Sequence, residues 1–317
     1  MSRSQQDIES LEGNVVSIVD EVRSRGDVAL RELTARFDDV DLGTMPLVVE
    51  EEEYDIAEAS LPRAVREALD YAIANVRKAH EHQRGAVHSV HETRPGVRVA
   101  ERTVPIDSVG LYVPRGRGSF PSMLYMLAIP AAIAGVGRIC VATPPGHGGA
   151  VDAACLYAAR RCGVTDVYRV GGAQAVAAFA YGTESVPAVA KIVGPGSAYV
   201  AAAKRCVREI VDVGLPAGPS ESMIVADASA ESFTVVRDLL IEAEHGSDSQ
   251  AILVTTESSL AEQVAALLPD LVAATPEPRR GFLNNVFNGY GGLILARDLD
   301  EASDIVNAFA PEHLCLD

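Results

Sequence analysis

The sequence predicts an α/β protein, in which parallel sheets are covered by helices and a helical segment comes first. From residue 106 onward, short apolar runs alternate with segments of helical length, which is the pattern of βαβ units. Glycine-containing turns stand where several of these runs pass into the next helix. The chain of 317 residues is 48% hydrophobic and 22% charged, so it can form two or three domains with their own cores.

The first hundred residues are predicted to be mainly helical. Apolar residues recur at helical spacing in three stretches separated by acidic linkers, at residues 15–24, 27–37 and 63–82. The third stretch ends in His80 and His82, and His88 and His91 follow it. Four histidines could bind a metal ion, but we interpret residues 83–95 as a flexible exposed loop instead.

The central block is predicted to be a parallel sheet with helices on both faces. Strands are predicted at residues 108–113, 138–142, 166–170 and 191–193. Helices are predicted between and after them, at residues 122–134, 152–162, 173–181 and 197–209. Phosphates and dinucleotides bind at the carboxyl ends of such strands.

Two glycine turns in this block end in a polar side chain. They are Gly171-Gly-Ala-Gln174 and Gly194-Pro-Gly-Ser197. Glycine lets a ligand approach the backbone closely, but it is also the default residue of a tight turn. Neither turn is the GxGxxG fingerprint of dinucleotide-binding proteins. A ligand contact and a plain connection therefore both remain open for each turn.

The third block carries a carboxylate and an imidazole, the groups that bind zinc or move protons near neutral pH. Glu242 and His245 lie together on one side of a predicted helix. The apolar stripe on the other side is formed by Phe233, Val236, Leu240 and Ala243. An i, i+3 Glu/His pair can present two metal ligands. The alternative is a solvated helix end, with His245 near the C-terminus and Gly246 directly after it.

A second acid/imidazole pair, Glu312-His313, lies near the end of the sequence. It follows Pro311, which ends an apolar helix, and precedes Leu314-Cys315-Leu316, which is predicted to begin a strand. The pair is therefore expected on a loop at the edge of a sheet, where α/β proteins usually keep reactive groups. An ordinary exposed surface position is the alternative.

Composition narrows the expected partners and location. The net charge is −17 and no cluster of Lys and Arg stands out, which argues against a nucleic-acid partner. No apolar run approaches the roughly 18 residues of a membrane span, and the N-terminus has no hydrophobic signal core. We therefore expect a cytoplasmic protein. The five cysteines show no CxxC spacing and are read as reduced core residues.

Taken together, six segments resemble the histidinol dehydrogenase family, and they occur in that family's order over essentially the whole chain. They are Gly110-Leu-Tyr-Val-Pro114, the run from Val170 to Glu184, the run from Ile192 to Val200, Ala217-Gly-Pro-Ser-Glu221, the run from Ala243 to Gln250, and Ala310-Pro-Glu-His-Leu314. We expect an incomplete set of two Rossmann-like parallel-sheet domains, in which the catalytic domain is truncated, with an N-terminal helical segment. The expected blocks are residues 1–105, with the helical segment and the first part of the catalytic domain, 106–215, which binds NAD, and 216–317, the second part of the catalytic domain.

The resemblance implies an activity and its cofactors. Such an enzyme is an NAD-dependent alcohol and aldehyde dehydrogenase that oxidises L-histidinol through histidinal to L-histidine, in histidine biosynthesis. It uses Zn²⁺ to hold the substrate, and full-length members are expected to be homodimers. No membrane or nucleic acid takes part.

The resemblance also implies roles for individual residues. The positions that match the family's NAD contacts are Tyr112, Gln174 and Ser197. The positions that match zinc ligands and substrate contacts are Glu242 and His245, joined in substrate binding by Ser220 and His313. The acid/base pair corresponds to Glu312 and His313, in which the imidazole takes the alcohol proton and the carboxylate helps to activate water.

Three departures from the family pattern leave alternatives open. The family usually has Gln at position 242 and Asn at position 197, and a neutral turn where this chain has Arg115 and Arg117. Family members are also expected to continue past Asp317 and to supply a further Asp and His to the zinc. The alternatives are a paralogous zinc and NAD dehydrogenase of another small alcohol, or a non-catalytic fragment that binds little zinc.

Overall fold

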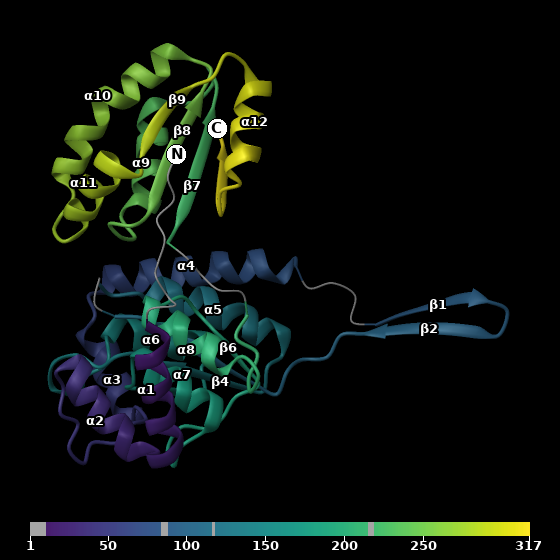
Figure 1. Ribbon diagram of the computed structural model, residues 1–317, viewed down its shortest axis with the longest axis vertical. Coiled ribbons are helices and arrows are strands. Elements are labelled where there is room, and N and C mark those ends of the chain that lie inside the picture. The colour runs from purple at the N-terminus through teal and green to yellow at the C-terminus, as the bar shows by residue number, and fades with distance from the viewer. Residues whose placement is uncertain (1–10, 84–87, 116–117, 215–218) are drawn as a thin grey trace. The chain divides into compact units, whose positions relative to one another are not determined.

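The computed structural model describes residues 11–83, 88–115, 118–214 and 219–317. The described residues form two compact units, and we call those up to residue 214 the N-terminal unit and those from residue 219 the C-terminal unit. The predicted boundary between residues 215 and 216 lies outside the described residues. Each unit is described by itself, with the element labels of Figure 1.

The N-terminal unit begins with four helices, and three of them confirm the predicted helical stretches. The helices are α1 (Glu12–Arg25), α2 (Asp27–Asp38), α3 (Glu51–Ser60) and α4 (Arg63–Glu81). The prediction of an acidic linker was wrong at α3. The Glu50 side chain accepts from the backbone of Glu53, and the Glu53 side chain accepts from the backbone of Glu50. This capping box, together with acids in the first turn, stabilises a helix where charge alone suggested a linker.

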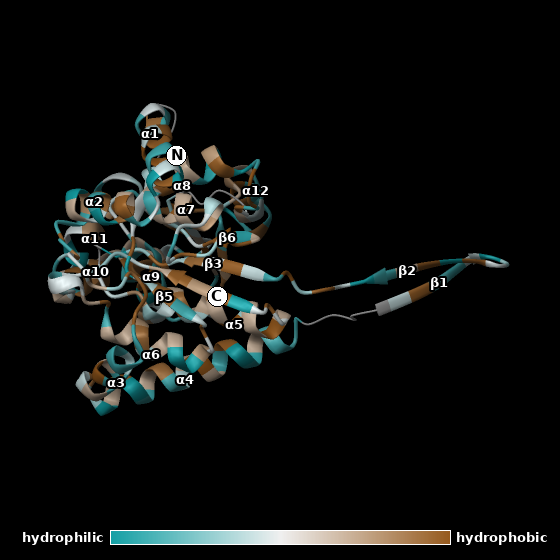
Figure 2. Ribbon diagram, turned by 90° about the horizontal axis from the view of Figure 1, so that it is seen from below, coloured by the Kyte–Doolittle hydropathy of each residue, from teal (hydrophilic) through white to brown (hydrophobic). Residues whose placement is uncertain are grey.

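An antiparallel hairpin follows, where the sequence predicted a flexible loop. Within the described part of the chain, strand β1 (His88–Arg94) pairs only with β2 (Val97–Arg102), so the prediction was wrong for residues 88–94. The valines of the hairpin are largely exposed, and Figure 2 shows hydrophobic segments among hydrophilic ones along both strands. Among the described side chains, no group of three possible metal ligands contains His80, His82 or His91.

The predicted parallel sheet of the central block is confirmed. Its strands are β3 (Ser108–Tyr112), β4 (Arg138–Ala142), β5 (Asp166–Tyr168) and β6 (Lys191–Val193), in the order β5-β4-β3-β6. The connecting helices are α5 (Pro121–Ala134), α6 (Ala153–Cys162), α7 (Gly172–Tyr181) and α8 (Ala198–Val207). All neighbouring strands run parallel. Their carboxyl ends therefore meet at one edge of the sheet.

Both faces of this sheet are buried. Successive side chains of a strand point to opposite faces, so β3 contributes Val109 and Leu111 to one hydrophobic core and Tyr112 to the other. Helices α3, α4, α5 and α6 contribute to the first core, and α1, α2, α7 and α8 contribute to the second. The N-terminal helices are thus part of the packing that holds this sheet.

The C-terminal unit repeats the same strand order. Its strands are β7 (Glu221–Ala226), β8 (Gln250–Thr255), β9 (Gly292–Leu295) and β10 (His313–Leu316), all parallel and in the order β10-β7-β8-β9. Its helices are α9 (Ser232–Ala243), α10 (Ser258–Ala274), α11 (Arg279–Gly289) and α12 (Leu299–Phe309). In both sheets the first strand lies between the second and the fourth. Two Rossmann-like parallel sheets are therefore confirmed. None of the described helices is long and apolar enough to span a membrane.

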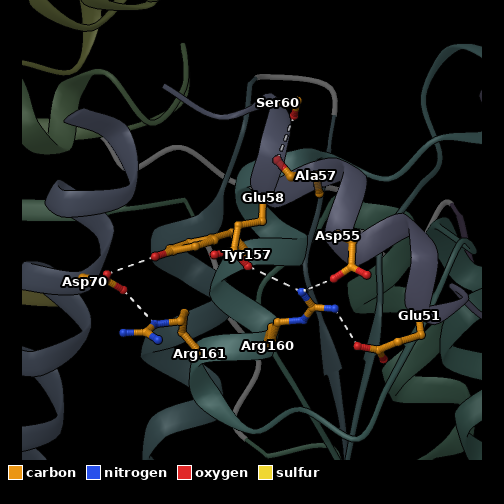
Figure 3. Close-up of polar contacts among 9 residues, drawn as sticks. All are labelled: Glu51, Asp55, Ala57, Glu58, Ser60, Asp70, Tyr157, Arg160 and Arg161. Atoms are coloured by element: carbon orange, nitrogen blue, oxygen red, sulfur yellow. Dashed lines mark hydrogen bonds and ion pairs between the residues drawn. The ribbon is translucent and has the colours of Figure 1, made fainter. Parts of the chain in front are cut away.

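A polar network joins three helices of the N-terminal unit (Figure 3). The Arg160 guanidinium of α6 donates to Glu51 at 2.5 Å, to Asp55 at 2.8 Å and to Glu58 at 3.4 Å, all on α3. Beside it, Asp70 of α4 accepts from Arg161 and from the Tyr157 hydroxyl. Most of these carboxylates are exposed, so water and salt weaken the pairs, and the network contributes little to the free energy of folding.

Arg169 also pairs with a carboxylate of α3, but its side chain is buried, unlike the exposed network around Arg160. Its side chain is 1% exposed and donates to the carbonyls of Gly149 and Val48 and to the carboxylate of Glu53. We predict that Arg169→Met lowers the free energy of unfolding by about 3 kcal/mol, because the partly buried Glu53 carboxylate loses its charged partner and keeps, among the described residues, only the backbone hydrogen bond from Glu50. Urea unfolding measures this. Arg160→Met is the matched control, and an equally large loss in that variant would contradict the argument from burial.

Candidate active site

Tyr112 and Gly194 meet at the carboxyl edge of the first sheet. Tyr112 ends β3 and is 4% exposed, and its hydroxyl accepts a hydrogen bond of 3.1 Å from the backbone of Gly172. Burial raises the pKa of Tyr112 to about 12. Gly194 follows the neighbouring strand β6 with φ +111, and a Cβ there would lie 2.2 Å from the Tyr112 carbonyl oxygen. Only glycine fits this approach of two backbones.

Gln174 lies in the first turn of α7, beside the same edge. The side chain is 1% exposed, and its Nε2 has no hydrogen-bond partner among the described residues. A Cβ on Gly172 would lie 2.5 Å from Gln174 Oε1, so the glycine turn makes the room that this amide occupies. A buried amide donor without a partner is a group that a ligand or an ordered water can satisfy.

Ser197 is the third residue predicted at this edge. It is the N-cap residue of α8, with extended backbone, and its exposed hydroxyl makes no capping bond within the described structure. The hydroxyl therefore remains available to a ligand. The structure thus places Tyr112, Gln174 and Ser197 at the carboxyl ends of β3, β5 and β6, on one edge of one sheet.

Asp38 is a residue that the sequence analysis missed. This last residue of α2 is half-buried, and its Oδ2 has no hydrogen-bond partner among the described residues. It lies close enough to Tyr112 to raise the pKa of that phenol, and burial raises the pKa of Asp38 itself to about 6, opposed by Arg115. An acid at a helix C-terminus opposes the helix dipole, but this local feature does not indicate that the carboxyl approaches Tyr112.

The raised pKa of Asp38 makes a prediction about pH. The folded state holds the proton more tightly than the unfolded chain, so this carboxyl favours folding below about pH 4, and that contribution is lost as pH rises to about 6. We predict that Asp38→Asn stabilises the protein at pH 7.5 by on the order of 1–2 kcal/mol, after allowance for partial exposure.

Urea unfolding at pH 5 and pH 7.5 checks this, and the gain is expected to be smaller at pH 5. Asp39→Asn is the control, since Asp39 is exposed and its left-handed φ of 54 suits Asn. A lower stability of Asp38→Asn at pH 7.5 would show that the carboxylate has a stabilising partner.

Arg115 follows the end of β3 and reaches the loop after β4. Its Nη1 donates to the Pro145 carbonyl at 3.2 Å, and its guanidinium occupies the space beside Gly146. The residue therefore brings positive charge to the same edge as Tyr112 and Asp38. Arg117, the second arginine of this turn, lies outside the described residues.

The predicted residues of the C-terminal unit gather at the other end of their sheet, at the amino ends of its strands. His313 begins β10 and pairs in register with Ser222 of β7, and Ser220 lies just before β7. The Ser220 carbonyl accepts from Gln250 at the start of β8. Since neighbouring strands lie about 4.8 Å apart, the starts of β10 and β8 are on the order of 10 Å from each other.

Glu242 and His245 lie at this amino edge as well, because their turn leads directly into β8. The helix α9 ends at Ala243, two residues earlier than predicted, so His245 lies in the turn beyond it. Its backbone bonds to the Glu242 carbonyl at 3.2 Å, and the side-chain atoms His245 Nδ1 and Glu242 Oε2 are 3.8 Å apart. The prediction that the two side chains point the same way is confirmed. The carboxylate is 19% and the imidazole 47% exposed.

Glu312 and His313 form the second pair at this edge. Their side chains approach to 3.9 Å between His313 Nε2 and Glu312 Oε2, and both are about half exposed. The structure thus brings Ser220, Glu242, His245, Glu312 and His313 to one edge of one sheet, where proton transfer and metal binding are chemically open. A group of possible metal ligands at the opposite edge, Asp238 with Cys315 and Asp317, contains none of the predicted residues.

Comparisons with known proteins identify the family. The family model described as histidinol dehydrogenase matches residues 1–317. A histidinol dehydrogenase homolog of Rhizobium meliloti is 47% identical over 315 residues, 99% of this chain and 69% of the relative. The histidinol dehydrogenase of Synechocystis is 44% identical over 312 residues, 98% of this chain and 72% of the relative.

A solved structure extends the likeness to the fold. The crystal structure of histidinol dehydrogenase from Elizabethkingia anophelis has a TM-score of 0.93 and 33% sequence identity, covering 99% of this chain and 72% of that one. The family match over every residue, two relatives above 40% identity and a shared fold lead to one assignment. The chain belongs to the histidinol dehydrogenase family, a family of oxidoreductases.

Proposed function

We propose that this protein oxidises L-histidinol through histidinal to L-histidine, with NAD as oxidant and zinc as a bound metal, in histidine biosynthesis. The observation that carries the proposal is that the side chains at both candidate sites are of the kinds that the family's reaction needs. A glycine-built edge with an unsatisfied amide lies in one unit, and two acid/imidazole pairs lie along one sheet edge in the other. Each of the predicted site residues therefore has surroundings that suit its proposed role.

The N-terminal unit has the features of an NAD-binding sheet. Tyr112, Gln174 and Ser197 are our proposed contacts, because they share the edge where parallel sheets bind dinucleotides and because the buried Gln174 amide lacks a partner for its Nε2 in the described structure. A Cβ on Gly172 would collide with the Gln174 amide and one on Gly194 with the Tyr112 carbonyl oxygen, so glycine at both positions lets these residues pack together at this edge. NAD supplies the hydride acceptor for both oxidations.

The C-terminal unit supplies two candidate ligands for a zinc ion. Glu242 and His245 offer a carboxylate and an imidazole, both good zinc ligands, at 3.8 Å from each other. A zinc ion held by these two side chains would act as a Lewis acid that accepts lone pairs of the substrate and so fixes its position. We assign Ser220, Glu242, His245 and His313 to substrate binding, since all lie at the amino edge of the same sheet.

His313 and Glu312 are our proposed acid/base pair. A neutral His313 imidazole accepts the hydroxyl proton of the substrate as the carbon gives up its hydride. In the second oxidation Glu312 accepts a proton from the water that adds to the aldehyde. Both side chains are about half exposed, so a substrate can reach them without displacing core residues.

Two further proposals follow from the family. We propose a homodimer that works in the cytoplasm. Neither nucleic acid nor a membrane is expected to take part, given the net charge of −17.

The test uses protein expressed from its complete reading frame. Growth of a histidine auxotroph on histidinol is expected to be restored, and two NADH are expected for each histidinol consumed, with zinc bound to the purified protein. The Glu312→Gln variant is expected to slow the second oxidation and to release histidinal. Protein that binds zinc and NAD but leaves histidinol unchanged would overturn the proposal.

A second candidate function is the oxidation of another small alcohol by the same chemistry. Two observations favour it, namely the carboxylate of Glu242 in place of the family's usual amide and the positive charge of Arg115 beside the cofactor edge. The relative described as a homolog is also slightly more similar than the one described as the enzyme. A panel of small amino alcohols and polyols, assayed for NADH, separates the two candidates. A Glu242→Gln variant that gains histidinol turnover would favour the second.

A further inference from the structure

A pocket of about 160 Å³ lies along α8 in the N-terminal unit. The turn Gly194-Pro-Gly196 forms one end of it, and Val213 and Gly214 face the helix. Along the helix, the wall includes Lys204, Arg205 and Arg208. Residues at this spacing lie on one helical face, so their side chains share the opening. Gly194 belongs to the proposed cofactor edge, whereas Lys204, Arg205 and Arg208 have no role in the function proposed above.

Lys204 is the half-buried cation of this pocket. Its Nζ donates a hydrogen bond of 2.5 Å to the Gly194 carbonyl, and it forms no ion pair with a carboxylate among the described residues. Burial lowers the pKa of Lys204 to about 8, and no acidic neighbour opposes this. A desolvated ammonium without a counter-charge is unfavourable by itself. An anion in the pocket would supply the missing charge.

The two arginines add positive charge, and their present ion pairs can be exchanged for contacts with a bound anion. Arg205 pairs with Glu12 at 3.1 Å and Arg208 with Glu209 at 3.4 Å, and these side chains are well exposed. Exposed ion pairs of this kind are weak and exchange readily. Three cations within five residues also stand out in a chain with 27 basic and 44 acidic residues. The local field therefore favours an anion although the protein as a whole repels one.

The walls and the backbone suit an anion as well. Val200, Ala201 and Val213 line the pocket with apolar atoms, which lowers the local polarity and strengthens each charge interaction. Gly196 has no side chain, and a Cβ there would lie 2.6 Å from Val200 Cβ, so the turn stays narrow. The N-terminus of α8, which carries partial positive charge, begins just after this turn.

We propose that this pocket binds a phosphate group, with Lys204 and Arg208 as its main charged contacts. The favoured source is the pyrophosphate of the dinucleotide, because Ser197 directly follows the turn that closes the pocket. That identification rests on the proposed function. The binding of a phosphate group does not, because a free phosphate ester would meet the same charges.

The experiment is calorimetric titration of the protein with inorganic pyrophosphate, ADP-ribose and NAD. Lys204→Met and Arg208→Gln are expected to weaken pyrophosphate binding at least tenfold, since each removes a charge-assisted contact. Lys191→Met is the matched control, because Lys191 pairs with Asp212 and does not line the pocket. The control is expected to bind as the unmodified protein does.

Comparison of the three ligands distinguishes the possible sources of the phosphate group. A parallel loss for pyrophosphate, ADP-ribose and NAD supports the cofactor as source, whereas a loss for pyrophosphate alone supports a free phosphate compound. Arg208 is exposed, so its variant keeps the test valid if Lys204→Met does not fold. Unmodified protein that binds none of the three ligands at millimolar concentration, or pocket variants that bind as tightly as the control, would overturn the proposal. Protein that binds pyrophosphate but not NAD would overturn the proposed function and leave the phosphate pocket standing.

Discussion

His313→Ala is expected to lower the turnover of histidinol by about 100-fold to 10,000-fold, the range that a positioned general base contributes. The imidazole is about half exposed at the start of an edge strand, so its removal leaves the packing of the C-terminal unit intact. The assay is NADH formation by protein from the complete reading frame, at saturating histidinol and NAD. His82→Ala is a matched control, because His82 is an exposed imidazole at the end of α4.

A second pair of variants distinguishes the base from a metal ligand. His313→Ala is expected to keep its zinc and lose turnover, whereas His245→Ala is expected to lose both. Metal analysis of the purified variants gives this answer independently of activity. Unchanged turnover in His313→Ala would remove the acid/base assignment, and zinc loss in that variant would make His313 a ligand instead.

Gly194→Ala is expected to be the most damaging single substitution at the cofactor edge. A Cβ would meet the Tyr112 carbonyl oxygen at 2.2 Å, and φ +111 is a conformation that side-chain-bearing residues rarely adopt. Backbone strain and overpacking each cost about 1–3 kcal/mol, so we expect a loss of about 4 kcal/mol in the free energy of unfolding. NAD binding is expected to disappear, because Tyr112 moves.

Gly148→Ala separates the two contributions. Gly148 also has a positive φ of 67, but nothing lies within 4 Å of the added Cβ, so strain acts there without a collision. Its loss is expected to be about 1–2 kcal/mol. Urea unfolding of both variants and NAD titration of each complete the comparison. A Gly194→Ala protein as stable as Gly148→Ala would contradict the close approach of β3 and β6.

The central sheet could be predicted from the sequence because its strands are buried on both faces. Runs such as the one around Val109 and Leu111 are apolar throughout, and glycine turns mark their ends. The hairpin β1-β2 could not be found in this way. Its strands are exposed on both faces, so neither apolar continuity nor a clear alternation identifies them. Helix α3 was missed because its acids resemble a linker, although its capping box was present in the sequence.

The candidate site was predictable only where it is local. The spacing of Glu242 and His245 gives their common direction, and that part is confirmed by their 3.8 Å separation. The neighbourhood of His313 and Ser222 depends on the pairing of β10 with β7, which no short-range pattern encodes. Asp38 was missed for the same reason, since its approach to Tyr112 follows from the packing of α2 on the second core of its unit.

The two sheets share a strand order, yet their polar groups gather at opposite ends. A nucleotide placed on the second sheet by superposition with the first would therefore lie at the carboxyl ends of the strands, away from the acid/imidazole pairs. The connections after β7 and β8, at residues 227–231 and 256–257, lie far from the chemistry of their own unit. Those loops are the natural attachment points for fluorophores or affinity tags that report on this unit while leaving its acid/imidazole pairs undisturbed.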